Sequence, residues 1–355
     1  MLHIAVCTMA TVKDTANHVN NFSDYIRTSF SEFLKLQPTL HRDDVDRVLH
    51  EPAIVKYYRP TNQPWRYYLI SLFQIHNETG NVWTHLIGFI IMWCILGVLS
   101  AEYDVWTERH SWPMLVFGLC CVISTMTSTC VHLLHSRSVY HHYSLFMIDY
   151  IGATLYSFGS GIQAFYACSD KEMYEYLGRM YLPTLTFVTW LNFVVLCLSK
   201  LMFGHNPCDV RRKLMMISMM TVQATIVTLP FGPRYYRCYF SDTCSFSSLN
   251  HLTISWIFFV SSAFFFGSHL PEKLFPGKCD IFGQGHQIFH VISVVNQMWQ
   301  FHSMRLDLST GASDHTEPDF LVIMAALSVL VLVDTICYVF LKRRIPSVAK
   351  EEKQS

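Results

Sequence analysis

The chain has 355 residues, of which 51% are hydrophobic and only 15% are charged. A typical soluble domain carries about 25% charged residues, so this composition favours a membrane protein over a soluble one. Lys and Arg number 26 and Asp and Glu number 26, which excludes the strong positive field expected of a nucleic-acid-binding protein.

Residues 1–80 mix apolar and charged side chains and are expected to form a cytoplasmic region with some helix. Its last part is rich in aromatic residues, in Tyr57–Pro60, Trp65–Tyr68 and Ser71–Phe73. This pattern predicts an amphipathic piece at the inner membrane interface. Ordinary packing of a cytoplasmic helix explains the same pattern equally well.

Eight apolar runs follow, and most are long enough to cross about 30 Å of hydrocarbon as a helix. They are residues 82–101, 113–134, 145–167, 180–198, 214–231, 249–266, 286–301 and 320–341. The short connections favour a single helix bundle. We therefore predict an all-α polytopic membrane protein. Its parts are a seven-helix core in residues 81–303, an external loop with an eighth helix in 304–341, and a cytoplasmic tail in 342–355.

The orientation of the bundle follows from the basic residues of alternate loops, because cytoplasmic loops carry an excess of Lys and Arg. On one side lie Arg137, Lys200, Arg211, Arg212, Lys213, Lys273, Lys278 and the tail Lys342–Arg344. Both termini are therefore predicted to be cytoplasmic. A seven-span arrangement would leave the basic tail on the wrong side. The glycosylation sequons at Asn21 and Asn77 would not be used in this orientation.

Most of the 12 cysteines are scattered through apolar stretches and are expected to be small buried hydrophobes. Cys238 and Cys244 differ, since they bracket a polar loop that this orientation places outside. They could form a disulfide in an oxidising compartment. The spacing alone leaves the bonded and the free forms open.

Two histidines four residues apart, His286 and His290, stand at the start of the seventh apolar run. This spacing places both imidazoles on one face of a helix. His132 lies within a turn of the cytoplasmic end of the second run, and Asp149 lies about one turn inside the third. At roughly 1.5 Å of rise per residue, all of them lie within about 6 Å of one plane near the inner leaflet. We expect them to meet.

Ionisable groups inside membrane helices are costly unless something pairs with them. Three neutral imidazoles with an open fourth position are the ligand set of a catalytic zinc, so His132, His286 and His290 are predicted to bind Zn²⁺. Asp149 could then accept a proton from water. Ser128, one turn before His132, could orient the water or donate to a substrate carbonyl. Such a centre suits the hydrolysis of a lipid amide or ester.

Structural roles remain alternatives for each of these residues. The histidine pair could be a packing feature, Asp149 could cap a helix or pair with a base, and Ser128 could bond to its own helix backbone. Other polar residues are predicted to be structural from the start. His85 is expected to pack or hydrogen-bond at the inner interface. His76, Asn77 and Glu78 are expected to cap the first span or to orient the preceding segment. His269 and His302 are expected to be structural histidines whose hydrogen bonds are satisfied.

Several strings in this order and spacing resemble the progestin and adipoQ receptor family. They are Arg59-Pro60, Ser71–Phe73, His76–Leu86, Ser128-x-x-x-His132, Asp149-Tyr150-x-Gly152, Phe275–Gly277 and Gly285–His290. The resemblance runs from about Glu51 to His302. It implies seven core helices, a cytoplasmic N-terminus, opposite to G-protein-coupled receptors, and a zinc site near the inner leaflet. The implied ligands are His132, His286 and His290, with Asp149 and Ser128 beside them.

Within that family the chain looks more like the membrane progestin receptor branch. It has an additional C-terminal span, and Asn77 stands where adiponectin receptors usually carry Thr. The resemblance implies a steroid receptor of the plasma membrane that binds a progestin-like ligand and is read by a G protein or another cytoplasmic effector. The alternatives are a zinc-dependent lipid amidohydrolase of ceramidase type, an adiponectin-receptor-like hormone receptor, and a zinc ion that only clips two helices together.

Overall fold

The computed structural model describes residues 36–104, 106–204, 209–242 and 244–351. The sequon at Asn21 lies outside them. The chain divides into two compact units, Met1–Pro38 and Thr39–Ser355, and the description below concerns the second.

Eight long helices of 19 to 29 residues make up most of this unit. They are α3 (Thr79–Glu102), α4 (Ser111–Leu134), α5 (Val139–Ala167), α7 (Tyr181–Phe203), α8 (Val210–Thr228), α10 (Asn250–Ser268), α11 (Gly285–Ser309) and α12 (Phe320–Leu341). Each apolar run of the sequence lies mainly on one of them. Three shorter helices lie between or after them: α6 (Lys171–Leu177), α9 (Gly232–Tyr239) and α13 (Ile345–Glu351).

Two helix boundaries differ from the prediction, and a sharp bend follows α8. α5 begins at Val139, six residues before the apolar run, so Asp149 lies about three turns inside the helix and not one. The polar residues His141 and His142 hid this start, because they interrupt the apolar pattern although His142 is buried in the bundle. α11 continues to Ser309 and has 25 residues, so it extends beyond the apolar run at 286–301. α8 and α9 meet at an angle of 65°.

The number of membrane spans is supported only in part. In the regions that the structure describes, five helices are long and apolar enough to cross a membrane, and six if α8 and α9 are one broken span. α5 and α11 do not meet this test. They carry polar residues of the pocket and histidine cluster, among them Asp149, His286 and His290. The chain is therefore a multi-pass membrane protein. The total number of spans depends on whether α5 and α11 also cross the membrane.

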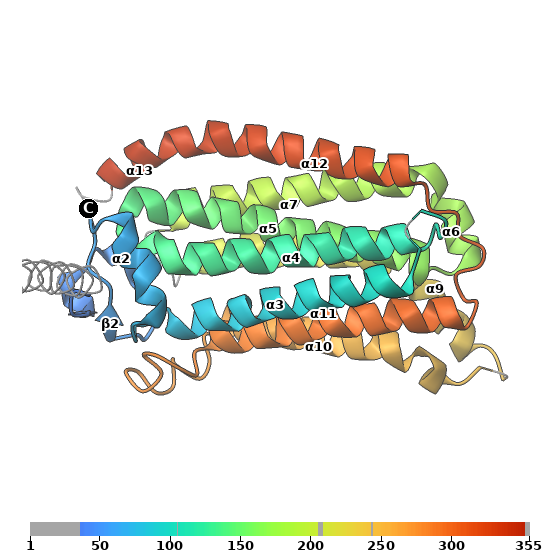
Figure 1. Cartoon of the computed structure of the whole chain (residues 1–355), viewed down its shortest axis with the longest axis horizontal. Coiled ribbons are helices and arrows are strands. Elements are labelled where there is room, and N and C mark those ends of the chain that lie inside the picture. Colours follow the sequence, from blue (N-terminus) through green and yellow to red (C-terminus); the bar gives the residue numbers. More distant parts are fainter. Residues whose placement is uncertain (1–35, 105, 205–208, 243, 352–355) are drawn as a thin grey trace, which may run out of the picture. The chain divides into compact units, whose positions relative to one another are not determined.

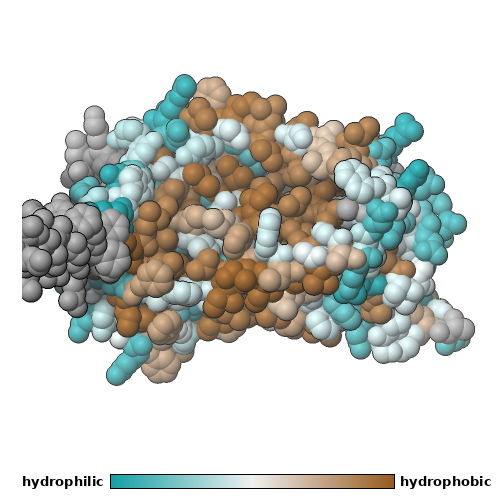
Figure 2. All heavy atoms as spheres, in the orientation of Figure 1, coloured by the Kyte–Doolittle hydropathy of each residue, from teal (hydrophilic) through white to brown (hydrophobic). Residues whose placement is uncertain are grey.

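The long helices run side by side (Figure 1). α4 packs between α3 and α5, α10 packs on α11, and α7 contacts α5, α8 and α12. On the face shown in Figure 2, hydrophobic side chains gather along the middle of the helices and hydrophilic ones gather at both ends. This distribution is that of a helix bundle with an apolar belt in the hydrocarbon and polar ends in water.

The segment before α3 is folded against one end of the bundle. It contains strands β1 (Leu40–His41) and β2 (Lys56–Tyr58), which pair antiparallel, and the short helix α2 (Trp65–Ile70). Short 3₁₀ turns complete the chain: Arg42–Asp44, Arg47–Leu49, Ser71–Phe73, His135–Arg137, Gly178–Met180, Phe246–Leu249 and Lys342–Arg344. In this aromatic-rich part, α2 is an α-helix, whereas Tyr57 and Tyr58 belong to a strand.

The structure also describes the cysteine pair and the second glycosylation sequon. Cys238, at the end of α9, is disulfide-bonded to Cys244. Asn77 is 3% exposed, and its backbone N–H donates to the Tyr57 carbonyl at 2.9 Å. The Asn77 side chain is therefore inaccessible in the folded structure.

Candidate metal centre

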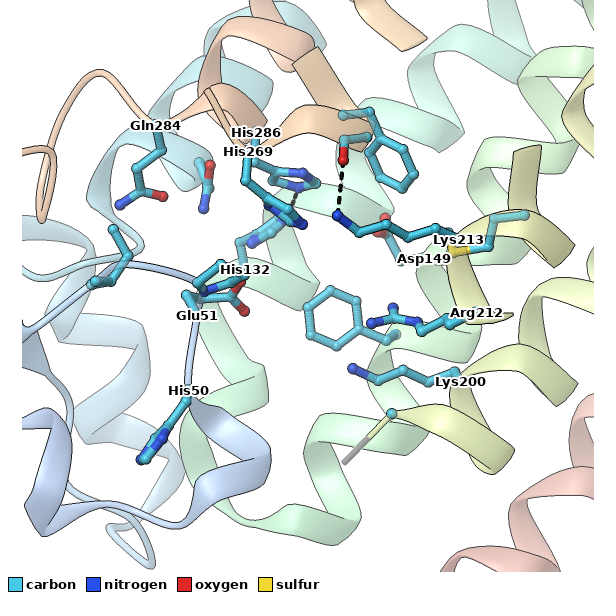
Figure 3. Close-up of a pocket in the computed structure, with 18 of the residues that line it drawn as sticks. His50, Glu51, His132, Asp149, Lys200, Arg212, Lys213, His269, Gln284 and His286 are labelled. Carbon is cyan, nitrogen blue, oxygen red and sulfur yellow. Dashed lines mark hydrogen bonds between the residues drawn. The ribbon is translucent and has the colours of Figure 1, made fainter. Parts of the chain in front are cut away.

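The three predicted histidines meet at one end of the bundle. His132 comes from the last turn of α4, and His286 and His290 come from the first turns of α11. The His132 and His286 Nε2 atoms are 3.3 Å apart, and one ring nitrogen from each of the three histidines lies within 4.8 Å of the others. Figure 3 shows His132 and His286 turned toward one another. This cluster could hold a metal ion.

Hydrogen bonds to the protein fix two of the three rings through Nδ1. His132 Nδ1 lies 2.8 Å from the Glu78 carboxylate. His290 Nδ1 lies 3.1 Å from the Thr84 hydroxyl. When Nδ1 donates a hydrogen bond, the lone pair of a neutral imidazole is on Nε2, which is the arrangement found in metal-ligating histidines. The donor set therefore fits a metal that prefers imidazole, such as zinc.

Glu78 is the functional candidate that the sequence did not reveal. It was expected to cap α3 or to orient the preceding segment, and it stands at the N-cap position without a side-chain capping bond. Its Oε2 contacts His132, its Oε1 lies 3.4 Å from His135 Nε2, and Asn81 donates to it at 2.7 Å. Glu78, His132 and His135 form a second group that could hold a metal ion. Its only sequence signal is a carboxylate beside an apolar run, which many helix starts share.

Asp149 and Ser128 lie near His132. Ser128, one turn before His132 on α4, is 4% exposed and hydrogen-bonds to the Asp149 carboxylate across to α5. Asp149 lines the same pocket as His132 and His286 (Figure 3). The helices approach closely here, since a Cβ at Gly152 would lie 2.0 Å from the Thr127 hydroxyl.

A buried arginine holds the end of α4 that carries His132. Arg59 is 1% exposed and donates to the carbonyl oxygens of His132 and Leu133 and to the hydroxyls of Ser71 and Ser136. The last carbonyls of a helix have no partner within the helix, and a cation is favourable there. Arg59 therefore joins the segment before α3 to the backbone of a candidate ligand.

Among the histidines that were expected to be structural, His85 and His269 lie close to the cluster. His269 follows α10 and pairs with Glu272 at 3.8 Å, and His302 packs on Trp299. His85 stacks on His290, with ring centroids 3.6 Å apart, so it contacts the cluster itself. Neither His85 ring nitrogen has a hydrogen-bond partner in the described structure, so of its two predicted roles packing is observed and hydrogen bonding is not.

The metal cluster opens into a pocket at the same end of the bundle. Its opposite wall carries Lys200, Arg212 and Lys213 from α7 and α8 (Figure 3). Glu51, from the segment before β2, closes the pocket from the side of the chain's N-terminal part. Burial and then the nearby Glu78 carboxylate raise the pKa of Glu51 to about 7. The pocket therefore brings a titratable carboxyl and three cations close to the histidines.

A second pocket lies farther along the helices, between α5, α8, α10 and α11. Its apolar wall includes Val227, Phe231, Leu252, Trp256 and Phe259. Its polar side is a network in which Tyr156 donates to Gln300 at 2.9 Å and Asn296 donates to Tyr156 at 3.4 Å. The side-chain amide oxygen of Asn296, Oδ1, is buried and has no hydrogen-bond partner in the described structure. This pocket is suited to an apolar ligand with one or two polar groups.

Comparisons with known proteins identify the family of this chain. The family model for haemolysin-III related proteins matches residues 73–301. The chain is 35% identical over 274 residues to membrane progestin receptor beta of Homo sapiens, covering 77% of each protein. It is 36% identical over 278 residues to membrane progestin receptor alpha-B of Danio rerio, covering 78% of each, and 32% identical over 280 residues to membrane progestin receptor alpha of Homo sapiens, covering 77% of this chain and 79% of that one. The chain therefore belongs to the haemolysin-III related family, which includes the progestin and adipoQ receptors.

Proposed function

We propose that this protein is a plasma-membrane receptor for a progestin-like steroid, with a zinc centre formed by His132, His286 and His290. The names of its relatives support the ligand class. The pocket between α5, α8, α10 and α11 supports it physically, because an apolar wall faces Gln300 and Asn296. A steroid carries a rigid apolar skeleton with polar groups at its ends, and such a pocket can bury the skeleton while it satisfies a polar end.

The observation that best supports a metal ion is that three imidazoles meet at one point and that hydrogen bonds orient two of them. Nδ1 of His132 and of His290 is held by Glu78 and Thr84, which leaves Nε2 for the ion. Zinc bound there would supply a Lewis acid. Two protein side chains position the groups around the ion. Glu78 fixes the His132 imidazole, and Ser128 orients the Asp149 carboxylate.

A second function is favoured by one observation, the Ser128–Asp149 pair beside the cluster. We propose as the alternative a zinc-dependent hydrolase of a ceramide-like lipid amide. In this function Asp149 accepts a proton from water. Ser128 donates to the carboxylate or to a substrate carbonyl. A steroid bound in the second pocket could then regulate hydrolysis, provided that it binds one conformation more tightly than the other.

For the membrane arrangement we propose eight spans, with α5 and α11 crossing alongside the more apolar helices and both termini in the cytoplasm. α5 packs on α4 and α11 packs on α10, and both have the length of a span. The bond between Cys238 and Cys244 supports an external, oxidising location for that loop. A tag at Met1 that antibody reaches on intact cells would contradict this orientation.

The receptor function is tested by equilibrium binding of a labelled progestin to purified protein in nanodiscs. We expect saturable binding that Asn296→Leu and Gln300→Leu each weaken by about tenfold, the loss that corresponds to one hydrogen bond. Thr221→Val, on the exposed face of α8, is the control and should bind normally. A properly folded wild-type protein that shows no saturable binding would rule the receptor function out.

One set of variants tests zinc binding and lipid hydrolysis separately. We expect His290→Ala and His132→Ala to lose zinc, measured by elemental analysis, while His302→Ala at the far end of α11 keeps it. Asp149→Asn should keep zinc and lose turnover of a fluorescent ceramide. If the wild type holds zinc but hydrolyses no lipid, and metal removal unfolds the bundle, the ion is a structural clip.

A further inference from the structure

The connection between α10 and α11, residues 269–284, has a surface that its sequence does not suggest. Figure 1 shows it at the end of the bundle where α2 and β2 also lie. Its charged residues balance, with Glu272 and Asp280 against Lys273 and Lys278. A neutral connection of this kind would ordinarily be read as a solvated loop. The structure separates the two signs of charge.

Both acidic side chains turn inward and are used by backbone donors. The Glu272 carboxylate is 3% exposed and accepts from the Gly285 N–H at 2.7 Å, at the start of α11. The Asp280 carboxylate is 4% exposed and accepts from the N–H groups of Val55 and Lys56 at 2.9 and 3.1 Å. Neither acid therefore contributes charge to the outer surface.

The outer surface of the connection is cationic and apolar. Lys273 and Lys278 are both exposed. Between and beside them, Leu274, Phe275 and Phe282 are 66%, 57% and 64% exposed. Large apolar side chains exposed together mark a contact with a partner or a membrane. Their combination with lysines is the composition of an interfacial membrane-binding surface.

This surface is held in shape by hydrogen bonds within the connection and to the segment before α3. Leu274 N–H donates to the Pro271 carbonyl at 2.9 Å, Lys278 N–H donates to Phe275 at 3.0 Å, and Gly277 N–H donates to Ala53 at 3.2 Å. Gly277 has φ of +76°, which a side chain would disfavour. A preorganised surface loses little conformational entropy when it binds.

We propose that the 271–283 surface is a binding site for anionic phospholipids in the leaflet at the metal-centre end. Leu274, Phe275 and Phe282 enter the boundary between headgroups and acyl chains, and Lys273 and Lys278 pair with the anionic headgroups. The site lies next to the candidate metal centre along the chain, because Glu272 holds the N–H of Gly285, the residue before His286. A protein partner on the same surface is the competing outcome.

The test places an environment-sensitive fluorescent amino acid at position 275 or 282 of the full-length chain in nanodiscs. One nanodisc contains phosphatidylcholine alone and the other contains about 30% phosphatidylserine. We expect blue-shifted emission that brominated lipids quench, and quenching at least twofold stronger with phosphatidylserine. The same probe at Lys56, an exposed side chain of β2, reports a position in water and should not be quenched.

Charge variants test the lysines separately. Lys273→Gln with Lys278→Gln should abolish the phosphatidylserine dependence. Lys171→Gln, at an exposed position at the start of α6, should leave it unchanged. Absence of quenching at both positions overturns the site, and leaves the protein-partner explanation. Quenching that does not depend on phosphatidylserine overturns the anionic specificity. Because the probe variants retain both lysines and both acids, their folding does not depend on the charge changes.

Discussion

The Glu78 carboxylate and the His132 imidazole lie 2.8 Å apart, and both side chains are buried. Glu78 stands at the start of α3 and His132 near the end of α4, so this contact ties two helices to one ring. A carboxylate that accepts from Nδ1 raises the basicity of Nε2 and fixes the direction of its lone pair. The contact therefore links the start of α3 to the candidate metal centre.

Glu78→Gln should weaken zinc binding without removing a ligand. We expect a loss of affinity of about 10- to 100-fold, the usual effect of changing a residue that orients a metal-binding histidine. Competition with a zinc chelator, followed by elemental analysis, measures it. Glu108→Gln, at an exposed position before α4, is the matched control. An unchanged affinity in Glu78→Gln would show that Glu78 does not orient a metal ligand.

Gly152→Ala should push α5 away from α4 beside Ser128 and Asp149. The new Cβ would lie 2.0 Å from Thr127 Oγ1 and 3.2 Å from the Ser124 Cα, and the backbone cannot move aside as a flexible side chain can. We expect a lower thermal midpoint and weaker zinc retention. Gly97→Ala in α3 meets nothing within 4 Å, so it should be neutral or slightly stabilising. Equal behaviour of the two variants would contradict the close approach.

Arg59→Leu should destabilise the bundle, because the last carbonyls of α4 and two buried hydroxyls lose their donor. Buried groups left without partners cost about 1–3 kcal/mol each, so we expect the free energy of unfolding to fall by about 3 kcal/mol or more. Arg59→Lys should recover only part of it, since one ammonium cannot reach acceptors arranged for a planar guanidinium. Thermal unfolding in detergent measures both, against the exposed Arg47→Leu. A midpoint unaffected by Arg59→Leu would be inconsistent with this role.

Glu51 should make the segment before α3 sensitive to pH. Its folded pKa of about 7 exceeds the ordinary value of 4.5, so the folded state binds more protons between these values. The protonated Glu51 carboxyl stabilises the folded state, and this stabilisation is complete below pH 4.5 and is lost as the pH rises through 7. We expect hydrogen-exchange protection of residues 46–58, corrected for intrinsic rates, to fall by up to about tenfold from pH 6 to pH 8.

Glu51→Gln is the control for this titration, because an amide of similar shape does not ionise. Its protection should be nearly the same at both pH values. The residues of α6, at the other end of the bundle, should show no difference between the variant and the wild type. A pH response that persists in Glu51→Gln would assign the titration to another group.

The sequence by itself determined the features that depend on periodicity and composition. Apolar runs place the long helices, since a helix inside a membrane must be apolar over most of its length. The i, i+4 spacing places His286 and His290 on one face. The depth of His132 and Asp149 along their runs was enough to expect a meeting at one end, although α5 begins at Val139, before its apolar run, and includes the polar His141 and His142.

Tertiary structure alone decided which polar groups accompany those histidines and which way each side chain faces. Glu78 looks like any acidic residue before a helix, and only the packing of α3 against α4 brings it to His132. The same holds for Arg59, which reaches the end of α4 from a segment more than 70 residues earlier. The acids and lysines of residues 271–283 cancel in the sequence and are separated only by backbone donors that the fold supplies. Such contacts join distant segments, and local spacing carries no information about them.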